Sequence, residues 1–288
     1  ILRFAAAASI CAALASSAHA QKFDGKSAFE FTRRVVAFGP RPVNTPAHKQ
    51  MQAYIKGELK ARGCQVIEDT FEGATPKGRI PMNNIICKFP GTSGRAVVYT
   101  GHYDTKLFPG QKFVGANDAG SSTGVLLEMA RALSRQPRKH DLFLVFFDGE
   151  EAIGEWTSTD GIHGSRNLAS RWHKDGTLKR IDALVNIDMI GDKNLGIMQE
   201  YNSSPQLRRQ VWQIARELGY SKYFLDSGGA IEDDHMPFVT RGVNALDLID
   251  FDYGDNWHTD RDTLDKLSPA SLQVVGDVLV ELLKRLEK

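Results

Sequence analysis

The chain has 288 residues, of which 42% are hydrophobic and 25% are charged, and its formal net charge is +1. This composition is typical of a globular protein with enough apolar residues for one large core. A charge so close to zero gives no support to nucleic-acid binding or to attraction by an anionic membrane, and no basic run stands out.

Residues 1–20 differ in composition from the rest of the chain. Arg3 precedes a run of small apolar residues, and Ala18-His19-Ala20 follows that run, an order typical of a signal peptide with its cleavage site. The apolar run is too short to cross a bilayer. We therefore expect cleavage after residue 20, export to the periplasm or the exterior, a mature domain at 21–288 and no stable membrane insertion.

Two helices and two strands are expected next. Ser27 with Glu30 three residues later has the pattern of a capping box, so a helix is predicted from there to about residue 38. Pro46 favours a second helix start, and that helix is predicted to end at Gly63. Strands are predicted at 64–71 and 83–89, joined by a loop. Their cysteines, Cys64 and Cys87, could form a disulfide in an exported protein or remain two free thiols.

Strands then alternate with helices to the end of the chain. The expected strands are 96–103, 142–147, 183–187 and 243–249, and the expected helices are 120–134, 163–173, 205–218 and 269–286. This alternation predicts an α/β fold with one domain and three layers (α/β/α), built on a central, mostly parallel, mixed sheet of six strands. No linker divides residues 21–288.

The stretch Phe146-Phe147-Asp148-Gly149-Glu150-Glu151 places two adjacent carboxylates at the end of a predicted buried strand. Ligands of open α/β sheets bind at that edge. Neighbouring glutamates repel each other there unless a positive charge is close, and no Lys or Arg lies between Asp141 and Arg166. A metal ion is the simplest explanation; the alternative is an ordinary loop with both glutamates in water.

Three other stretches supply further polar side chains. Asp118 follows a glycine-rich turn and could simply cap the next helix; Asp188 ends a strand; His258 could be structural. Taken together, Asp118, Glu151 and His258 offer two oxygen ligands and one nitrogen ligand, which suit a catalytic zinc with an open fourth position. No HExxH or CxxC motif competes for the metal.

At this point the sequence resembles the zinc-dependent exopeptidase superfamily and, within it, the glutaminyl-peptide cyclotransferase family. The matching stretches are GHYDT, GANDAGSSTGVLLEMARAL, LFLVFFDGEEAIGEW, GIHGSRNLA, NIDMIG, EDDHMPF, RGV and NWHT. They follow one another in family order from about residue 28 to the end, and as a set they are highly specific.

The resemblance implies a role for each matching residue. Asp118, Glu151 and His258 resemble the ligands of a single zinc, and Glu150 resembles the general acid/base. Asp188 and Asp233 resemble a carboxylate pair that shares a hydrogen bond. Trp156 and Trp257 resemble the walls of the substrate pocket, although core packing would also explain a tryptophan. Glu232 stands where animal cyclases usually have Gln, a change of little effect if its backbone contacts the substrate. The disulfide of the animal forms near strand 96–103 is absent.

The resemblance also implies the reaction. The enzyme would convert N-terminal Gln of peptides or proteins to pyroglutamate with release of ammonia, and N-terminal Glu slowly, and we expect a monomer. The main alternative is an aminopeptidase of the same superfamily with two zinc ions, since His102 and Asp188 could complete a second site. Asp233 and the two tryptophans favour the cyclase. A non-catalytic binding protein on this fold would have lost a ligand or Glu150, and neither is lost.

Overall fold

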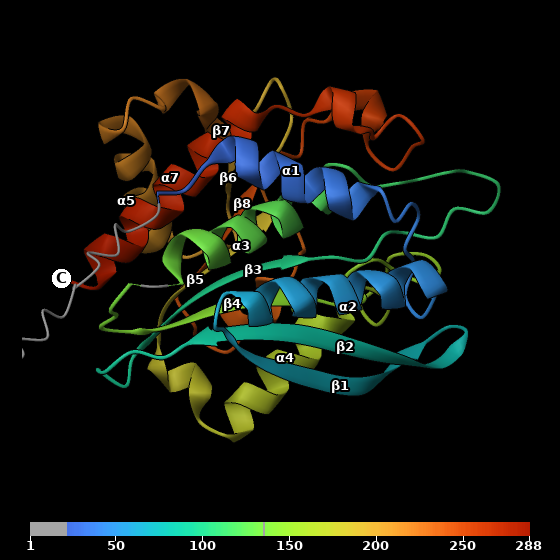
Figure 1. The fold of residues 1–288 in the computed structure, drawn as a ribbon, viewed down its shortest axis with the longest axis horizontal. Helices are drawn as coiled ribbons and strands as arrows, with labels where there is room; N and C mark the ends of the chain where they lie inside the picture. Colours follow the sequence, from blue (N-terminus) through green and yellow to red (C-terminus); the bar gives the residue numbers. More distant parts are fainter. Residues whose placement is uncertain (1–21, 135) are drawn as a thin grey trace, which may run out of the picture.

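The computed structural model describes residues 22–134 and 136–288, which form three layers with a mixed sheet in the middle (Figure 1). The helices are α1 (Gly25–Val36), α2 (Pro46–Ala61), α3 (Gly120–Leu133), α4 (His163–Lys174), α5 (Pro205–Glu217), α6 (Met236–Val239) and α7 (Pro269–Leu286). The strands are β1 (Gln65–Thr75), β2 (Gly78–Phe89), β3 (Ala96–His102), β4 (Asp141–Phe147), β5 (Ile181–Asp188), β6 (Ile197–Glu200), β7 (Phe224–Gly229) and β8 (Ala245–Ile249). The expected signal peptide lies outside the described residues.

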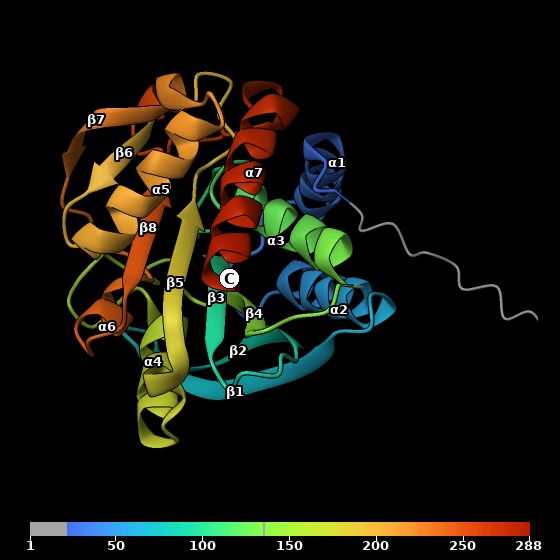
Figure 2. The ribbon, with the colours of Figure 1, turned by 90° about the vertical axis from the view of Figure 1, so that its left-hand side faces the viewer.

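The main sheet has six strands in the order β1-β2-β4-β3-β5-β8. Strands β4, β3, β5 and β8 run parallel, whereas β1 and β2 join them as an antiparallel hairpin at one edge (Figure 2). The predicted mixed, mostly parallel sheet is therefore confirmed. Because parallel strands end at the same edge, residues that follow β3, β4, β5 and β8 are brought together there.

Alternation along the strands gives each face of the sheet its own core. In β4, Leu144 and Phe146 pack in the larger core with α1, α2, α3, α5 and α7, whereas Val145 and Phe147 face α4 and α6. All four side chains are fully buried. Buried on both faces, β4 reads in the sequence as a continuous apolar run rather than an alternating one.

Three local predictions differ from the structure. The first two strands are longer than expected and meet in a tight turn, and the small parallel sheet of β6 and β7 was not predicted. The capping box was also wrong. Asp24 caps α1 by accepting a hydrogen bond from the Lys26 amide, while Ser27 donates to Glu128 of α3. Tertiary contact thus removes Ser27 from the local pattern.

Two further findings concern the cysteines and the possibility of a membrane-spanning helix. Cys64 and Cys87 form a disulfide between the end of α2 and strand β2, with Cα atoms 5.6 Å apart. The structure thus contains the first of the two alternatives left open by the sequence. In the part of the chain that the structure describes, no helix combines the length and apolarity needed to cross a membrane.

Candidate metal centre and substrate pocket

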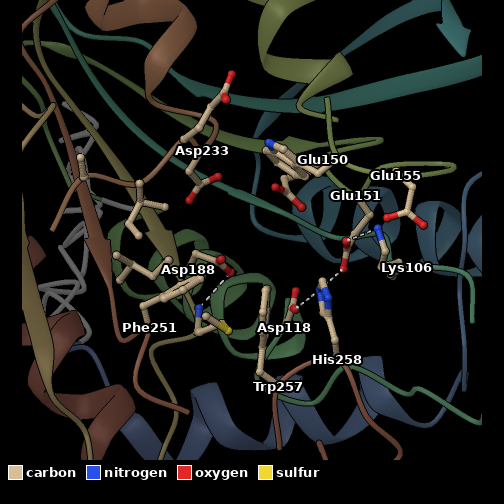
Figure 3. Close-up of a pocket in the computed structure, with 16 residues that line it drawn as sticks. Lys106, Asp118, Glu150, Glu151, Glu155, Asp188, Asp233, Phe251, Trp257 and His258 are labelled. Atoms are coloured by element: carbon tan, nitrogen blue, oxygen red, sulfur yellow. Dashed lines mark hydrogen bonds and ion pairs between the residues drawn. The ribbon is translucent and has the colours of Figure 1, made fainter. Parts of the chain in front are cut away.

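A pocket of about 430 Å³ opens at the edge where the parallel strands end (Figure 3). Its floor carries carboxylates and its walls carry aromatic side chains. Its lining includes all nine residues singled out in the sequence: Asp118, Glu150, Glu151, Trp156, Asp188, Glu232, Asp233, Trp257 and His258. Residues from six separate stretches therefore converge on one hollow of ordinary ligand-binding size.

Asp118, Glu151 and His258 form a compact group on one side of this pocket. Asp118 precedes α3, Glu151 follows β4 and His258 lies beyond the end of β8. His258 Nε2 is 3.2 Å from Asp118 Oδ2 and 3.3 Å from Glu151 Oε1. The carboxylate of Asp118 does not cap α3, because that helix begins without a side-chain cap. The simpler role considered for Asp118 is thereby excluded.

The spacing and charge of this group fit a zinc ion. Ligands about 2.0–2.1 Å from a tetrahedral metal lie about 3.3 Å from one another, which is the separation seen here. Glu151 Oε1 is buried without a hydrogen-bond partner among the described residues. Burial lowers the pKa of His258, but Asp118 and Glu151 outweigh it and raise that pKa to about 10. Two carboxylates around one imidazole thus favour positive charge at this point.

Asp262 joins two of these ligand segments and was missed in the sequence. Its buried carboxylate accepts hydrogen bonds from the amides of Asn117 (2.8 Å) and Asp118 (3.1 Å) and from the Tyr253 hydroxyl (2.8 Å). Asp262 lies four residues after His258 in the sequence. Its hydrogen bonds therefore hold the segment that carries Asp118 against the segment that carries His258. Its place four residues after a candidate ligand was the only sequence signal.

The two glutamates are held by a different carboxylate. Strand β4 ends at Phe147, and Gly149, with φ of 66°, turns the chain so that Glu150 and Glu151 reach the pocket. Asp104 accepts hydrogen bonds from the amides of both glutamates, each at 3.3 Å. Burial, together with the negative charges of Glu151 and Asp233, raises the pKa of Glu150 well above its ordinary range against the opposing effect of His102. Glu150 is therefore prone to bind a proton.

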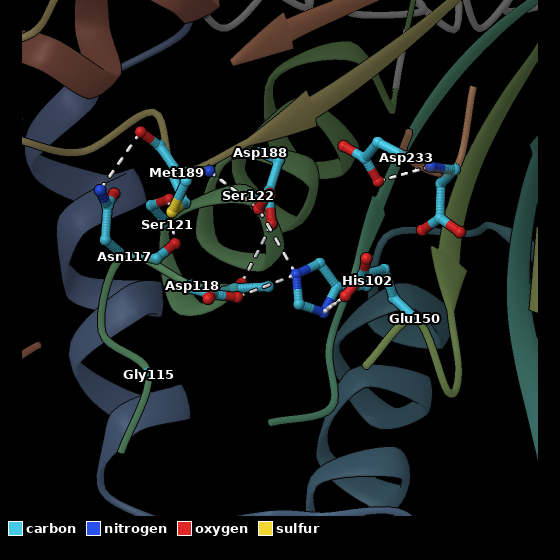
Figure 4. A network of polar contacts seen from close by, with 12 residues as sticks. His102, Gly115, Asn117, Asp118, Ser121, Ser122, Glu150, Asp188, Met189 and Asp233 are labelled. Carbon is cyan, nitrogen blue, oxygen red and sulfur yellow. Dashed lines mark hydrogen bonds and ion pairs between the residues drawn. The ribbon is translucent and has the colours of Figure 1, made fainter. Parts of the chain in front are cut away.

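A second group of candidate ligands shares Asp118 with the first (Figure 4). His102 Nε2 lies 3.2 Å from Asp118 Oδ1 and 3.4 Å from Asp188 Oδ1. Both ring nitrogens of His102 are buried, and among residues 22–134 and 136–288 neither has a well-formed hydrogen bond. The spacing matches that of the first group, but His102 does not line the pocket. Only the first group presents all three of its side chains to the hollow.

Asp188 and Asp233 both reach the pocket, but their hydrogen bonds point in different directions. Asp188 Oδ1 accepts a hydrogen bond from the Met189 amide, and Asp233 Oδ2 accepts one from Asn186 Nδ2, both at 2.9 Å. The hydrogen bond expected between these two carboxylates is not among the contacts of the described residues. Burial, together with the negative charges of Asp118 and Asp233, raises the pKa of Asp188 to about 7 against the opposing effect of His102.

Neither tryptophan is a core residue. Trp156 is 38% exposed and Trp257 is 42% exposed. The indole of Trp257 stacks on the His258 ring with centroids 4.2 Å apart and contacts Phe251 at 5.2 Å. Core packing, the simpler explanation for a tryptophan, is thus excluded for both. Glu232 stands half-exposed at the rim, with its carboxylate 3.6 Å from Arg166.

Lys106 and Phe251 line the pocket without having been predicted. Lys106 Nζ lies 3.9 Å from Glu151 Oε2 and donates a hydrogen bond to the Ala152 carbonyl. No Lys or Arg lies between Asp141 and Arg166 in the sequence, but Lys106 reaches Glu151 in space from the segment that follows β3. One lysine at this distance balances only a small part of the charge of the seven carboxylates that line the pocket.

Comparisons with known proteins agree on one family. Residues 84–283 match the family described as Peptidase family M28. A glutaminyl-peptide cyclotransferase of Drosophila melanogaster is 32% identical over 81% of this chain and 73% of its own length. The crystal structure of an Acidobacteriales bacterium glutaminyl cyclase is 41% identical, covers 97% of this chain and 99% of its own, and superposes with a TM-score of 0.89. A Zn-dependent exopeptidase from Parabacteroides distasonis is 28% identical, covers 92% and 99%, and has a TM-score of 0.83.

Proposed function

The chain belongs to peptidase family M28, and we propose that it is a glutaminyl-peptide cyclotransferase. Its substrates would be peptides or proteins with an N-terminal glutamine, whose α-amine attacks the γ-amide carbon so that pyroglutamate forms and ammonia leaves. N-terminal glutamate would react slowly, because an ionised carboxylate is a poorer electrophile than an amide.

Asp118, Glu151 and His258 are the residues that would hold one zinc ion per chain. Such an ion supplies a Lewis acid for the γ-carbonyl oxygen. The proposal of a single ion rests on the pocket lining, because only this group presents all its ligands to the hollow. His102 would remain a buried partner of Asp118 and Asp188.

Glu150 is the proposed carrier of the proton. The α-amine must lose a proton as it attacks, and ammonia must gain one as it leaves, so one group in reach of both nitrogens can serve both steps. Burial and neighbouring negative charge raise the pKa of Glu150, which strengthens it as a base and lets it return the proton as an acid. Asp188 and Asp233 surround the same space with carboxylates, which favours an amine there.

The aromatic walls would hold the glutamine side chain folded back on its own amine. Trp156, Trp257 and Phe251 line the same pocket as the carboxylates. Because nucleophile and electrophile belong to one molecule, restricting the side chain to attack geometry accounts for much of the rate enhancement. The observation that carries the proposal is that one pocket is lined by a three-ligand group, a buried glutamate next to it and three aromatic side chains.

A metal-dependent aminopeptidase is the second candidate, since His102, Asp118 and Asp188 could hold another ion. One preparation decides between the two. A cyclotransferase releases ammonia from peptides with N-terminal Gln, leaves a Leu anilide nearly intact and contains one zinc per chain. A peptidase would cleave the Leu anilide readily, release no ammonia from Gln peptides and contain about two metals per chain.

Export as a monomer after cleavage at residue 20 is part of the same proposal. The order of basic, apolar and small residues in 1–20 supports it. The new N-terminus would be Gln21, itself a substrate of the proposed reaction. Mass spectrometry of exported protein should find pyroglutamate at residue 21, and an intact leader on exported protein would contradict the cleavage.

A further inference from the structure

One wall of the pocket is a loop, not a strand or helix. Residues 230–234, here called the wall loop, connect β7 to α6, and Ile231, Glu232 and Asp233 line the hollow. A loop at a substrate site needs contacts that hold it in one conformation. Those contacts come from outside the pocket, at the end of β6.

Glu200, the last residue of β6, is fully buried and gathers five donors around its carboxylate. Oε1 accepts hydrogen bonds from the amides of Asn202 and Ile231, both at 2.9 Å. Oε2 accepts from the Ser203 amide (2.6 Å), the Ser203 hydroxyl (2.7 Å) and His235 Nε2 (3.1 Å). Burial opposes ionisation, but these hydrogen bonds lower the pKa of Glu200 to about 2.

The wall loop is therefore held by hydrogen bonds at its start and just after its end. Glu200 binds the Ile231 amide at its start, and Asn202 Nδ2 donates to the Ile231 carbonyl at 3.1 Å. His235, fully buried, binds the same carboxylate just after the loop ends. Asn186 links the middle of the loop to the sheet by donating to Asp233 and to Asp247.

We propose that Glu200 and His235 form a buried latch whose role is to position the wall loop for substrate binding. Neither residue lines the pocket, so both are positioning residues rather than catalytic ones. The proposal rests on the proposed cyclotransferase function only in its choice of substrate. Loss of the latch should weaken binding of the glutamine substrate, while Asp118, Glu151 and His258 keep their arrangement.

Two variants of His235 give the sharpest test. His235→Gln keeps an amide N–H that can replace Nε2 as the donor to Glu200, whereas His235→Leu has a similar volume and no donor. We expect His235→Leu to raise KM for a Gln amide about tenfold, which is ~1.4 kcal/mol, with a smaller change in kcat and unchanged zinc content. His235→Gln should stay close to the wild type.

Glu200→Gln should raise KM as His235→Leu does. Both oxygens of Glu200 accept hydrogen bonds, so the nitrogen of the new amide group would face a donor in either orientation. Glu217→Gln, which removes an exposed carboxylate on α5, is the control and should leave KM, zinc content and hydrogen exchange of the wall loop unchanged. A measurement independent of activity is hydrogen exchange of the segment 230–239. Exchange there should be faster in His235→Leu than in His235→Gln, even if the substrate class proved different.

Equal KM values and equal exchange rates for the two His235 variants would overturn the latch. So would a loss confined to kcat or accompanied by loss of zinc. Absence of ammonia release by the wild type would instead refute the proposed function, and the exchange comparison would then decide the latch alone.

Discussion

Replacing Asp262 with asparagine tests how the metal ligands are held. Asp262→Asn keeps the shape of the side chain. Its amide nitrogen, however, must face one of the two backbone N–H groups that donate hydrogen bonds to the wild-type carboxylate. Turned toward Asp118, it leaves that buried amide unpaired in place of a hydrogen bond of 3.1 Å. An unpaired buried donor costs about 1–3 kcal/mol. Because Asp118 is a proposed ligand, we expect much of this cost to appear as weaker zinc binding.

The expected loss of zinc affinity is about 10- to 100-fold, the usual effect of removing a hydrogen bond behind a metal ligand. It would be measured by titrating the metal-free protein with zinc against a chromophoric chelator. Asp260→Asn is the matched control, since Asp260 is an exposed carboxylate on the same segment. Equal zinc affinities for Asp262→Asn and the control would refute the reasoning.

The remaining predictions concern the two glutamates, the disulfide and the response to acid. Glu151→Ala should lose most of its zinc, whereas Glu150→Gln should keep zinc and lose about 10²-fold or more in rate; equal zinc loss would contradict the division of roles. Replacing both cysteines by alanine should cost about 3 kcal/mol in urea unfolding, since the cross-link no longer restrains the unfolded chain; an unchanged midpoint would count against this. Glu200 stabilises the fold above pH 4.5, and this contribution, about 3 kcal/mol, should disappear as the pH falls from 4.5 to about 2. The stability gap between wild type and Glu200→Gln should therefore narrow over that range, and a constant gap would contradict it.

The sheet, and the convergence of candidate ligands at one of its edges, were predictable from the sequence for one physical reason. Continuous apolar runs such as Leu142–Phe147 identify buried parallel strands, and parallel strands end at one edge. Side chains that directly follow those strands, Glu150 and Glu151 among them, must then lie near one another. His258 is less directly predictable, because it lies in irregular structure beyond the end of β8; it was chosen because it completes an oxygen, oxygen and nitrogen ligand set, and the resemblance to a family implied the same role.

Residues that act through tertiary contacts were not predictable. Asp262 binds the amide of a residue 144 positions away, and Lys106 approaches Glu151 from another segment, so no local pattern marks either. Glu200 ends a strand that was itself missed, because β6 and β7 are short and β7 ends in two glycines. Ser27 shows the reverse effect: a good local capping signal was overridden by a contact with Glu128.

The proposed enzyme cyclises N-terminal glutamine to pyroglutamate, and water is not a reactant in that reaction. Incubation of the enzyme with a Gln peptide in heavy-oxygen water, followed by mass spectrometry of the product, tests it most directly. The account predicts a product lighter by one ammonia that has taken up no labelled oxygen, and its formation should be slowed about 10²-fold or more when Glu150 is replaced by Gln. Release of free glutamine with labelled oxygen in its new carboxyl group, together with an unlabelled peptide one residue shorter, would contradict the account.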